Sequence, residues 1–494
     1  MLPKPTFDRD SGVPIYRQLA EHLRLLAHTG KIQPGQRLPA TRDLAGWLGL
    51  NRSTVAAAYA VLASEGLVRG HVGRGSFLTG SPGASVLGLD WDELLVGDST
   101  TQPTLFPTAR AEECISFATS RPSEELFPIE EFRAACCEVI DSSQTASILQ
   151  LGSPAGYGPL REFLLDEARR AGEARGRDDV VVTNGCQQAL DLIQRVLVRP
   201  GDTVLVEDPV YPGLKNVFAR AKARLVGVRV GPEGLDVDHL RRLLARETPR
   251  LAVLTPNFQN PTGATLPLAS RFAILENLRE AGAVIVENDI YGELRYEGES
   301  IPALKRLDET GDTILLRSFS KVAFPGLRVG WVIGPKALLA RLAEAKQWVD
   351  LHTDQLSQAV VLRFAESGRL AAHRVRIVAA GAERLAAVLN GCSKYLPKET
   401  RFTRPQGGMN LWVQLPEPLD SSELLAASQR RNVIYLPGKY FEVTHHEPGA
   451  LRLSFAGLEP DKIRSGLAIL GEIFSEELEN RRGARRPELA TALV

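Results

Sequence analysis

The sequence contains no long apolar run and few cysteines, and both absences limit what the protein can be. No uninterrupted apolar stretch approaches the ~18 residues that a membrane-spanning helix needs. The first residues show no apolar core of a signal peptide, so we expect a protein of the reducing cytoplasm. The cysteines have no metal-ligand spacing, and their odd number argues against a disulfide framework; the five are Cys114, Cys136, Cys137, Cys186 and Cys392.

An excess of charge of one sign is also lacking over the whole chain, but not over its beginning. The 494 residues include 59 Lys and Arg against 59 Asp and Glu, so the formal net charge is zero. Residues 1–80 hold ten basic against five acidic side chains. Such a surplus is typical of a module that meets phosphates, although many solvated surfaces carry as much. The length is too great for one ordinary core, so we expect two or three domains.

The basic N-terminal stretch has the pattern of a helix-turn-helix. Apolar residues recur at helical spacing over 14–27, and two further short helices are predicted over 41–48 and from 52 onward. Gly49 suits the turn between these two helices, because the turn needs a positive φ. Thr41, and then Asn51 or Ser53, are candidate N-caps of the two short helices.

The second short helix and a following loop are the candidate DNA-binding elements. The helix would present Arg52, Ser53 and Thr54 at its N-terminal end, where recognition helices meet bases and phosphates. After it, residues 67–68 and 76–78 predict two strands, joined by a glycine-rich loop that would place Arg74 near a groove. The pattern of two helices alone is equally compatible with plain helix packing. The added loop and the local positive charge favour DNA binding.

The first 80 residues resemble the GntR-type winged helix. In that family the positions of Arg42, Arg52 and Thr54 and the glycines of the wing, here Gly73 and Gly75, touch DNA. The resemblance is carried by Leu38-Pro39-Ala40-Thr41-Arg42, Leu44-Ala45, Leu48-Gly49, Asn51-Arg52-Ser53-Thr54-Val55, Tyr59, Leu62, Glu65-Gly66 and Gly73-Arg74-Gly75-Ser76-Phe77.

Composition divides the rest of the chain into three parts. Residues 81–112 are rich in Ser, Thr, Pro and Gly and predict a flexible linker. Residues 113–480 alternate short apolar, β-branched runs with helical stretches, which predicts an α/β domain with a mainly parallel sheet covered on both faces. Residues 481–494, with four arginines near their start, predict a solvated, disordered tail.

Polar side chains follow successive predicted strands, where ligands of parallel sheets bind. Each fragment alone is compatible with an ordinary turn or helix cap, but their order along the chain indicates a site. The fragments are Cys186 and Gln187 at a helix start, Tyr211, Asn260, Asp289 with Tyr291, and Ser318 with Lys321 and Arg328.

This set fits pyridoxal 5′-phosphate (PLP). The aldehyde needs an amine, which Lys321 supplies, and the ring nitrogen needs an anion, which Asp289 supplies. Asn260 and Tyr291 suit the 3′-oxygen of the ring, and Tyr211 can stack on it. The phosphate group suits positive charge, hydroxyls and a helix N-terminus; these are Arg328, Ser318 and the helix start at Cys186 and Gln187.

Residues 113–480 look like a fold-type I aminotransferase, on the order of these motifs. The resemblance implies that Arg452, in Leu451-Arg452-Leu453-Ser454-Phe455, binds the carboxylate of a substrate or effector. One position departs from the family, which commonly has a tyrosine before Gly-x-Pro-x-Gly that reaches the phosphate of the neighbouring subunit. Here that position is Leu151, so either another group takes the role or the phosphate site is weaker.

A GntR-type winged helix joined to an aminotransferase-like body resembles the MocR (GabR-like) regulators. The resemblance implies a bacterial transcription factor that binds an operator as a head-to-tail homodimer and senses PLP or a small amino compound. Two alternatives stay open: a working aminotransferase with a DNA-binding appendage, and a DNA-binding module on a body that no longer binds cofactor. Vitamin B6 itself, GABA, taurine or another amino compound are all compatible effectors.

Overall fold

The computed structural model describes residues 3–8, 11–28, 31–32, 35–71, 75–79 and 114–484. They belong to two separate compact units, one N-terminal and one C-terminal, which we treat individually. Gly73 and Arg74 of the predicted wing, the predicted linker 81–112 and the chain beyond 484 lie outside the described residues.

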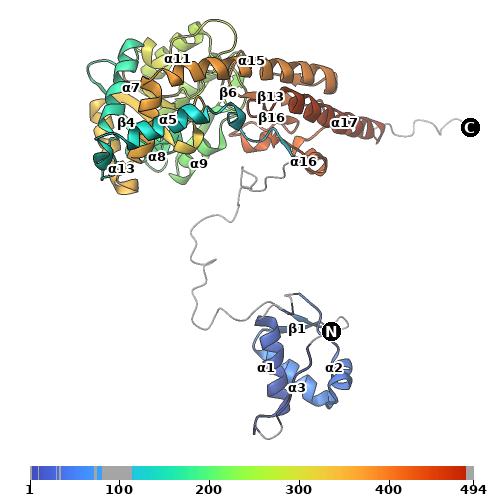
Figure 1. Ribbon diagram of the computed structural model, residues 1–494. Helices are drawn as coiled ribbons and strands as arrows, with labels where there is room; N and C mark the ends of the chain where they lie inside the picture. The colour runs from blue at the N-terminus through green and yellow to red at the C-terminus, as the bar shows by residue number, and fades with distance from the viewer. Residues whose placement is uncertain are drawn as a thin grey trace, which may run out of the picture. The chain divides into compact units, whose positions relative to one another are not determined.

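The described residues of the N-terminal unit form three helices and a β-hairpin (Figure 1). Its helices are α1 (Ile15–His28), α2 (Thr41–Leu48) and α3 (Arg52–Ser64), and its hairpin is formed by β1 (Val68–His71) and β2 (Gly75–Leu78). Apolar residues at helical spacing on all three helices form one buried cluster, which includes Leu19, Leu23, Leu44, Leu48, Val55 and Leu62.

The turn between α2 and α3 is built as the sequence predicts, but the caps differ. Gly49 ends α2 with a left-handed φ of 67°, a conformation that costs glycine little. Thr41 does not cap α2, because it is already the first helical residue and Ala40 occupies the cap position. Asn51 occupies the cap position of α3, yet its side chain makes no capping hydrogen bond. Neither helix start is therefore stabilised by a side-chain capping hydrogen bond.

The C-terminal unit is organised around an eight-stranded sheet in the order β4-β11-β10-β9-β8-β5-β6-β7. The five strands from β10 to β6 are parallel, β11 runs antiparallel to both its neighbours, and β7 is antiparallel to β6. The strands are β4 (Asp178–Asn184), β5 (Thr203–Asp208), β6 (Arg224–Gly231), β7 (Gly234–Leu235), β8 (Leu251–Leu254), β9 (Val284–Asn288), β10 (Ile314–Ser318) and β11 (Val329–Pro335). The predicted mainly parallel sheet is confirmed.

Alternate residues of these strands enter different hydrophobic clusters, because successive side chains of a strand point to opposite faces. Val204 and Val206 pack with helices α8 (Gly185–Leu197), α9 (Pro212–Arg220) and α13 (Lys336–Asp350), whereas Leu205 packs with helices of the other face. The other face is covered by α7 (Gly158–Arg170), α10 (Val237–Leu244), α11 (Leu268–Glu280) and α14 (Gln355–Glu366). Burial on both faces explains the nearly continuous apolar character of the strands.

A second, antiparallel sheet forms the far end of the unit in the order β12-β13-β16-β15. Its strands are β12 (Arg401–Phe402), β13 (Asn410–Gln414), β15 (Leu436–Pro437) and β16 (Ala450–Ser454), while β3 (Ile115–Ser116) pairs with β14 (Val433–Ile434). Figure 1 shows this sheet beside the long helices α15 (Arg369–Tyr395) and α17 (Pro460–Ala484). The remaining elements are η1 (Glu124–Leu126), α5 (Ile129–Ile140), α6 (Thr145–Ile148), α12 (Leu304–Leu307), η2 (Pro325–Leu327), α16 (Ser421–Arg430) and η3 (Gly438–Tyr440).

Helix α17 continues past the predicted domain end. The tail was expected to begin at residue 481, but the helix reaches Ala484. Arg481 pairs with Glu423 and Glu477, and Arg482 pairs with Glu399, so these arginines hold the helix end against the domain. The expectation was wrong for residues 481–484, because a run of arginines does not reveal carboxylates that lie far away in sequence.

Candidate functional site

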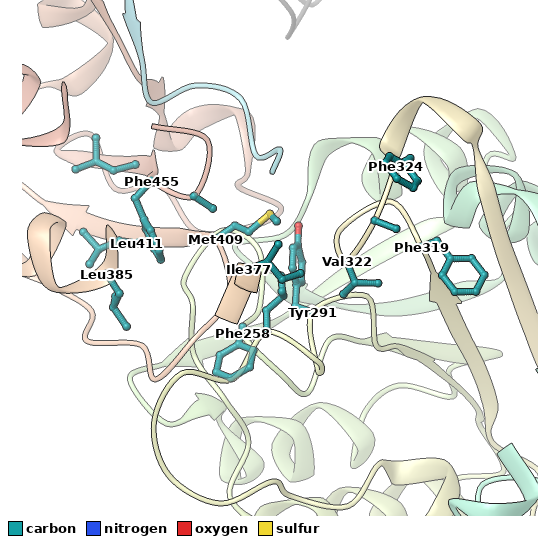
Figure 2. Packing of buried hydrophobic residues seen from close by; sticks show 14 of the residues in the cluster. Phe258, Tyr291, Phe319, Val322, Phe324, Ile377, Leu385, Met409, Leu411 and Phe455 are labelled. Atoms are coloured by element: carbon teal, nitrogen blue, oxygen red, sulfur yellow. The ribbon is translucent and has the colours of Figure 1, made fainter. Parts of the chain in front are cut away.

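The predicted site residues of the C-terminal unit converge at the carboxyl ends of the parallel strands. β8 leads to Asn260, β9 to Asp289 and Tyr291, and β10 to Ser318 and Lys321. The second sheet contributes Arg452 from β16. Figure 2 shows the ring of Tyr291 among apolar residues from both parts of the unit, including Met409 and Val322. The site therefore lies where the large sheet meets the smaller one.

Lys321 points toward the middle of this group. Its Nζ atom donates a hydrogen bond to the backbone oxygen of Ser120 at 2.6 Å and lies 5.8 Å from the centre of the Tyr291 ring. The Tyr291 hydroxyl accepts from Nδ2 of Asn260 at 3.4 Å, so these three side chains are neighbours. A primary amine beside a phenol and an amide is the arrangement that an aldehyde and its adjacent ring oxygen require.

Asp289 is held as a buried anion. Its Oδ1 accepts from Nδ2 of Asn257 at 2.8 Å, and its Oδ2 accepts from Nη2 of Arg317 at 2.8 Å. Burial by itself would raise the pKa of Asp289, but the charge of Arg317 and the hydrogen bonds from Asn257 and Arg317 hold the pKa below its ordinary value. An ionised carboxylate at this place fits the ring nitrogen of PLP.

The predicted phosphate side lies at the N-terminus of α8. Arg328 lies against this helix start: its Nη2 atom donates to the backbone oxygen of Asn184 at 3.4 Å, and its Nη1 atom donates to Oγ of Ser320 at 3.3 Å. The Ser318 hydroxyl lies 2.8 Å from the Ser320 hydroxyl. Gly185 has a φ of 74°, and a Cβ there would overlap Nη2 of Arg328. The cradle of free N–H groups, hydroxyls and guanidinium fits a phosphate group.

Cys186, Gln187 and Tyr211 were also predicted to bind the cofactor, and their side chains have different surroundings. Cys186 turns its thiol to the backbone oxygen of Arg317, and burial raises the pKa of that thiol to about 12, so only its backbone N–H can face a phosphate. Gln187 is exposed and donates to the backbone oxygen of Gly213. Burial raises the pKa of the Tyr211 phenol, and nearby Tyr291 and Arg452 also influence it, which locates Tyr211 at the same site.

Arg452 is buried beside Asn260. Its Nη1 atom donates to Oδ1 of Asn260 at 3.1 Å, Nη2 donates to the backbone oxygen of Ala118, and the guanidinium lies 5.0 Å from the centre of the Phe441 ring. Its Nε has no hydrogen-bond partner, and no acidic side chain of the described residues pairs with it. Burial lowers the pKa of this guanidinium to about 10. A buried cation without a counter-ion suits a ligand that brings a carboxylate.

Sequence reasoning missed several residues that complete this site. Asn257, in the loop that also holds Asn260, was not predicted as a site residue. Arg317 follows the apolar residues of β10, directly before Ser318, and was not predicted either. Glu173, which pairs with Arg317, is 144 positions away in the chain. The backbone oxygens of Ala118 and Ser120, which Arg452 and Lys321 contact, could not be inferred from side-chain types.

The predicted DNA-binding residues that are described in the N-terminal unit lie at the starts of α3, α2 and β2. Arg52 and Ser53 are exposed in the first turn of α3, and Thr54 follows them half-buried. Arg42, in α2, leaves 87% of its side chain exposed, and Gly75 begins β2. Exposed arginines at a helix N-terminus can approach phosphates or base edges.

Comparisons with known proteins define the class of this chain. The family model of class I and II aminotransferases matches residues 113–470, and that of the GntR family of bacterial regulatory proteins matches residues 15–78. The chain therefore belongs to the class I and II aminotransferase family, and it joins that domain to a GntR-type DNA-binding domain.

The same combination occurs in MocR-like regulators. The probable rhizopine catabolism regulatory protein MocR of Rhizobium meliloti is 29% identical over 94% of this chain and 95% of its own length. Aromatic-amino-acid aminotransferase 1 of Thermococcus litoralis is 34% identical, but the match spans 76% of this chain and 91% of that enzyme. The regulator matches nearly the whole chain and the enzyme only part of it, so this chain has the domain composition of the MocR-like regulators.

A solved structure agrees with the fold and with the cofactor. The α-aminoadipate aminotransferase LysN of Thermus thermophilus, complexed with N-(5′-phosphopyridoxyl)-L-leucine, is 36% identical with a TM-score of 0.74, covering 79% of this chain and all of that one. The family and this phosphopyridoxyl complex imply pyridoxal 5′-phosphate as the cofactor. No helix among the described residues is long and apolar enough to cross a membrane.

Proposed function

We propose that this protein regulates transcription by binding operator DNA through α3 and the hairpin, and by binding PLP and an amino compound in the C-terminal unit. Lys321 would anchor the cofactor, Asp289 would face its ring nitrogen, and Arg328 with the start of α8 would hold its phosphate. PLP supplies an aldehyde that condenses with amines and a ring that withdraws electrons from them. The assignment of each residue rests on the geometry described above.

The observation that carries the sensing role is the buried, uncompensated guanidinium of Arg452. It lies one hydrogen bond from Asn260, which in turn contacts Tyr291 next to Lys321. An amino acid or similar zwitterion could therefore present its amine toward Lys321 while its carboxylate meets Arg452. Such a ligand could change regulation only if it binds two arrangements of the protein with different affinity.

We also infer a cytoplasmic head-to-tail homodimer. Leu151 is 73% exposed and Trp348 is 84% exposed, and large apolar side chains are rarely left in water in such numbers. Leu151 lies near the start of α14, because Gln355 donates to the backbone oxygens of Ile148 and Gln150. Trp348 lies in the last turn of α13, which directly precedes α14 in the chain. A second copy covering this face would lie close to the phosphate side, since Asn184 at the start of α8 contacts Asp350. The segment 81–112 would link the two units.

A working aminotransferase is the second candidate. The lysine, the carboxylate and both arginines of the site are all present, and the relative from Thermococcus litoralis is named as such an enzyme. Rapid turnover of an amino donor with 2-oxoglutarate, without sequence-specific DNA binding, would favour this alternative. Operator binding that responds to ligand, with negligible turnover, supports the regulator.

Borohydride reduction of the PLP-loaded protein, followed by peptide mapping, tests the cofactor assignment. We expect the pyridoxyl group on Lys321. Lys321→Ala should lose the label and the ligand-dependent promoter response while keeping its fold and intrinsic DNA contacts. The matched control is Lys336→Ala, at the opposite end of β11, which should retain the label. A label elsewhere, or a promoter response that survives Lys321→Ala, would remove the sensing role.

A further inference from the structure

Asp289 forms an ion pair with the guanidinium of Arg317, which also pairs with a second carboxylate, that of Glu173. Nε and Nη2 of Arg317 lie 3.1 and 2.8 Å from Oδ2 of Asp289. The same Nη2 atom lies 2.8 Å from Oε1 of Glu173, and Nη1 contacts the other oxygen of Glu173. Arg317 leaves 21% of its side chain exposed, and the two carboxylate side chains leave 4% and 8%. The three groups form a largely buried row of charges with one net negative charge.

The opposite side of Asp289 is fixed as well. Nδ2 of Asn257 donates to its Oδ1 atom, and Oδ1 of Asn257 accepts from Nη2 of the fully buried Arg271 at 2.6 Å. Both oxygens of Asp289 therefore receive donors whose positions are set by buried arginines. The carboxylate cannot rotate without breaking several hydrogen bonds in a medium where their loss is costly.

This arrangement has an electrostatic consequence for whatever faces Asp289. A bare carboxylate next to a pyridine nitrogen stabilises the protonated ring, because opposite charges attract strongly at short range. A guanidinium in contact with the same carboxylate offsets part of that attraction. A second carboxylate on the guanidinium restores part of it. The three charges together therefore set the pKa of the ring nitrogen.

We propose that Arg317 and Glu173 are positioning residues that set the proton affinity of the cofactor's ring nitrogen by way of Asp289. The proposal rests on the placement of the PLP ring at Asp289 proposed above. A weakened pull on the ring proton makes the ring a weaker electron sink. With PLP bound, Arg317 would thus weaken the electron withdrawal that transamination needs, without affecting the ability of Lys321 and the aldehyde to bind amines. A site that binds amines but withdraws electrons weakly suits a sensor better than an enzyme.

Substitution at this row is not expected to disturb packing. The Arg317 side chain borders a cavity of about 550 Å³, which Trp331 and Arg374 also line, so a shorter side chain leaves room for water. The variants below leave in place the other charged or titratable groups that interact with Asp289, which are Arg271, Glu287, Cys186 and Glu293.

The experiment follows the ring nitrogen directly. The full-length protein is loaded with PLP carrying ¹⁵N in the ring, and the ¹⁵N chemical shift is recorded against pH. Glu173→Gln should lower the pKa of the ring nitrogen by about 1, because Arg317 then offsets Asp289 alone. Arg317→Gln should raise it, Arg317→Lys should lie nearer to the unchanged protein, and the double variant, which keeps one net negative charge, should lie close to it.

The variants distinguish the role of Arg317 and Glu173 from the placement of the PLP ring at Asp289. If Asp289→Asn shifts the ¹⁵N titration but neither single variant does, the role of Arg317 and Glu173 is wrong and the ring placement stands. If Asp289→Asn also leaves the titration unchanged, the ring placement itself fails. Glu173→Gln preserves size and keeps one of the two hydrogen bonds that Glu173 accepts from Arg317, so it carries the test alone if Arg317→Gln does not fold. A residue with a merely structural role would alter stability without moving the ¹⁵N titration.

Discussion

Arg452 illustrates at the scale of one residue how burial can indicate a ligand. A buried charge is unfavourable unless a partner compensates it, and none of the described carboxylates does so. Lys321, Asn260 and Tyr291 lie within a short chain of contacts from it. In the proposed function, the guanidinium would determine which end of an amino compound points away from the lysine.

Arg452→Gln keeps much of the volume and removes the charge. In the PLP-loaded protein we expect this change to weaken GABA binding by about ten- to a hundredfold, as the loss of a charge-assisted hydrogen bond predicts. Butylamine, which has no carboxylate, serves as the matched ligand and should bind equally to both proteins. Titration of the visible absorption band measures both. An equal loss for the two ligands would contradict a carboxylate role.

At the scale of elements, the close approach of β11 to α8 shapes the phosphate side. Gly330 pairs with Ser318 and Thr183 in the neighbouring strands. A Cβ at Gly330 would lie 2.7 Å from Cα of Gly185 and 3.1 Å from the backbone nitrogen of Cys186. The absence of that one carbon allows the N-terminus of α8 to lie beside the strand that begins with Val329.

Gly330→Ala should therefore push α8 away from the phosphate. Overpacking of this kind costs about 1–3 kcal/mol, so we expect PLP affinity to fall roughly tenfold or more and the melting temperature to drop. The control is Gly334→Ala on the same strand, where a Cβ meets its nearest neighbour at 3.9 Å. PLP titration and thermal denaturation compare the two. Equal behaviour of both variants would show that backbone closeness at Gly330 is not needed.

The first turn of α3 gives the element-scale test for the N-terminal unit. Arg52→Ala should weaken operator binding by about 1–3 kcal/mol if its guanidinium pairs with a guanine. Arg17→Ala, an exposed arginine on α1, is the control and should change affinity little. Fluorescence anisotropy with operator and scrambled DNA at fixed salt separates sequence-specific from general phosphate binding. An unchanged affinity for Arg52→Ala would mean that another element reads the DNA.

For the whole molecule, the exposed apolar face near α13 and α14 is the feature with the widest consequence. Trp348 and Leu351 are 84% and 57% exposed at the end of α13, close to the start of α8, where we propose that the phosphate binds. Burying such side chains is a main driving force of association. Dimerisation and cofactor binding would then support each other, because both depend on the same helix ends.

Trp348→Glu should convert the dimer to monomer, because it replaces the most exposed large apolar side chain of this face with a charge. Light scattering coupled to size-exclusion chromatography measures the mass, and operator affinity should fall because two linked heads bind more tightly than one. Phe272→Glu, at a 52% exposed site on α11, is the control and should stay dimeric. A Trp348→Glu protein that remains dimeric would locate the interface elsewhere.

The sequence by itself determined the order of elements and the types of chemical groups. Short apolar, β-branched runs that alternate with helical stretches predicted the sheet, and Lys321, Asp289 and Arg328 were recognised because they follow predicted strands. The short wing-like hairpin and the Gly49 turn were equally local signals. These features depend on neighbours in the chain, which a sequence shows directly.

Only the tertiary structure determined which charged and polar groups, distant along the chain, lie in contact. Arg317 meets Glu173 and Asp289 across 144 and 28 positions, and Arg452 meets Asn260 across 192. The antiparallel direction of β11 and the extension of α17 to Ala484 were likewise invisible, since both depend on pairing with remote segments. Electrostatic interactions depend on distance in space rather than on separation along the chain. The chemical groups of the site could therefore be predicted from the sequence, whereas the ion pairs and hydrogen bonds between them depend on the folded arrangement.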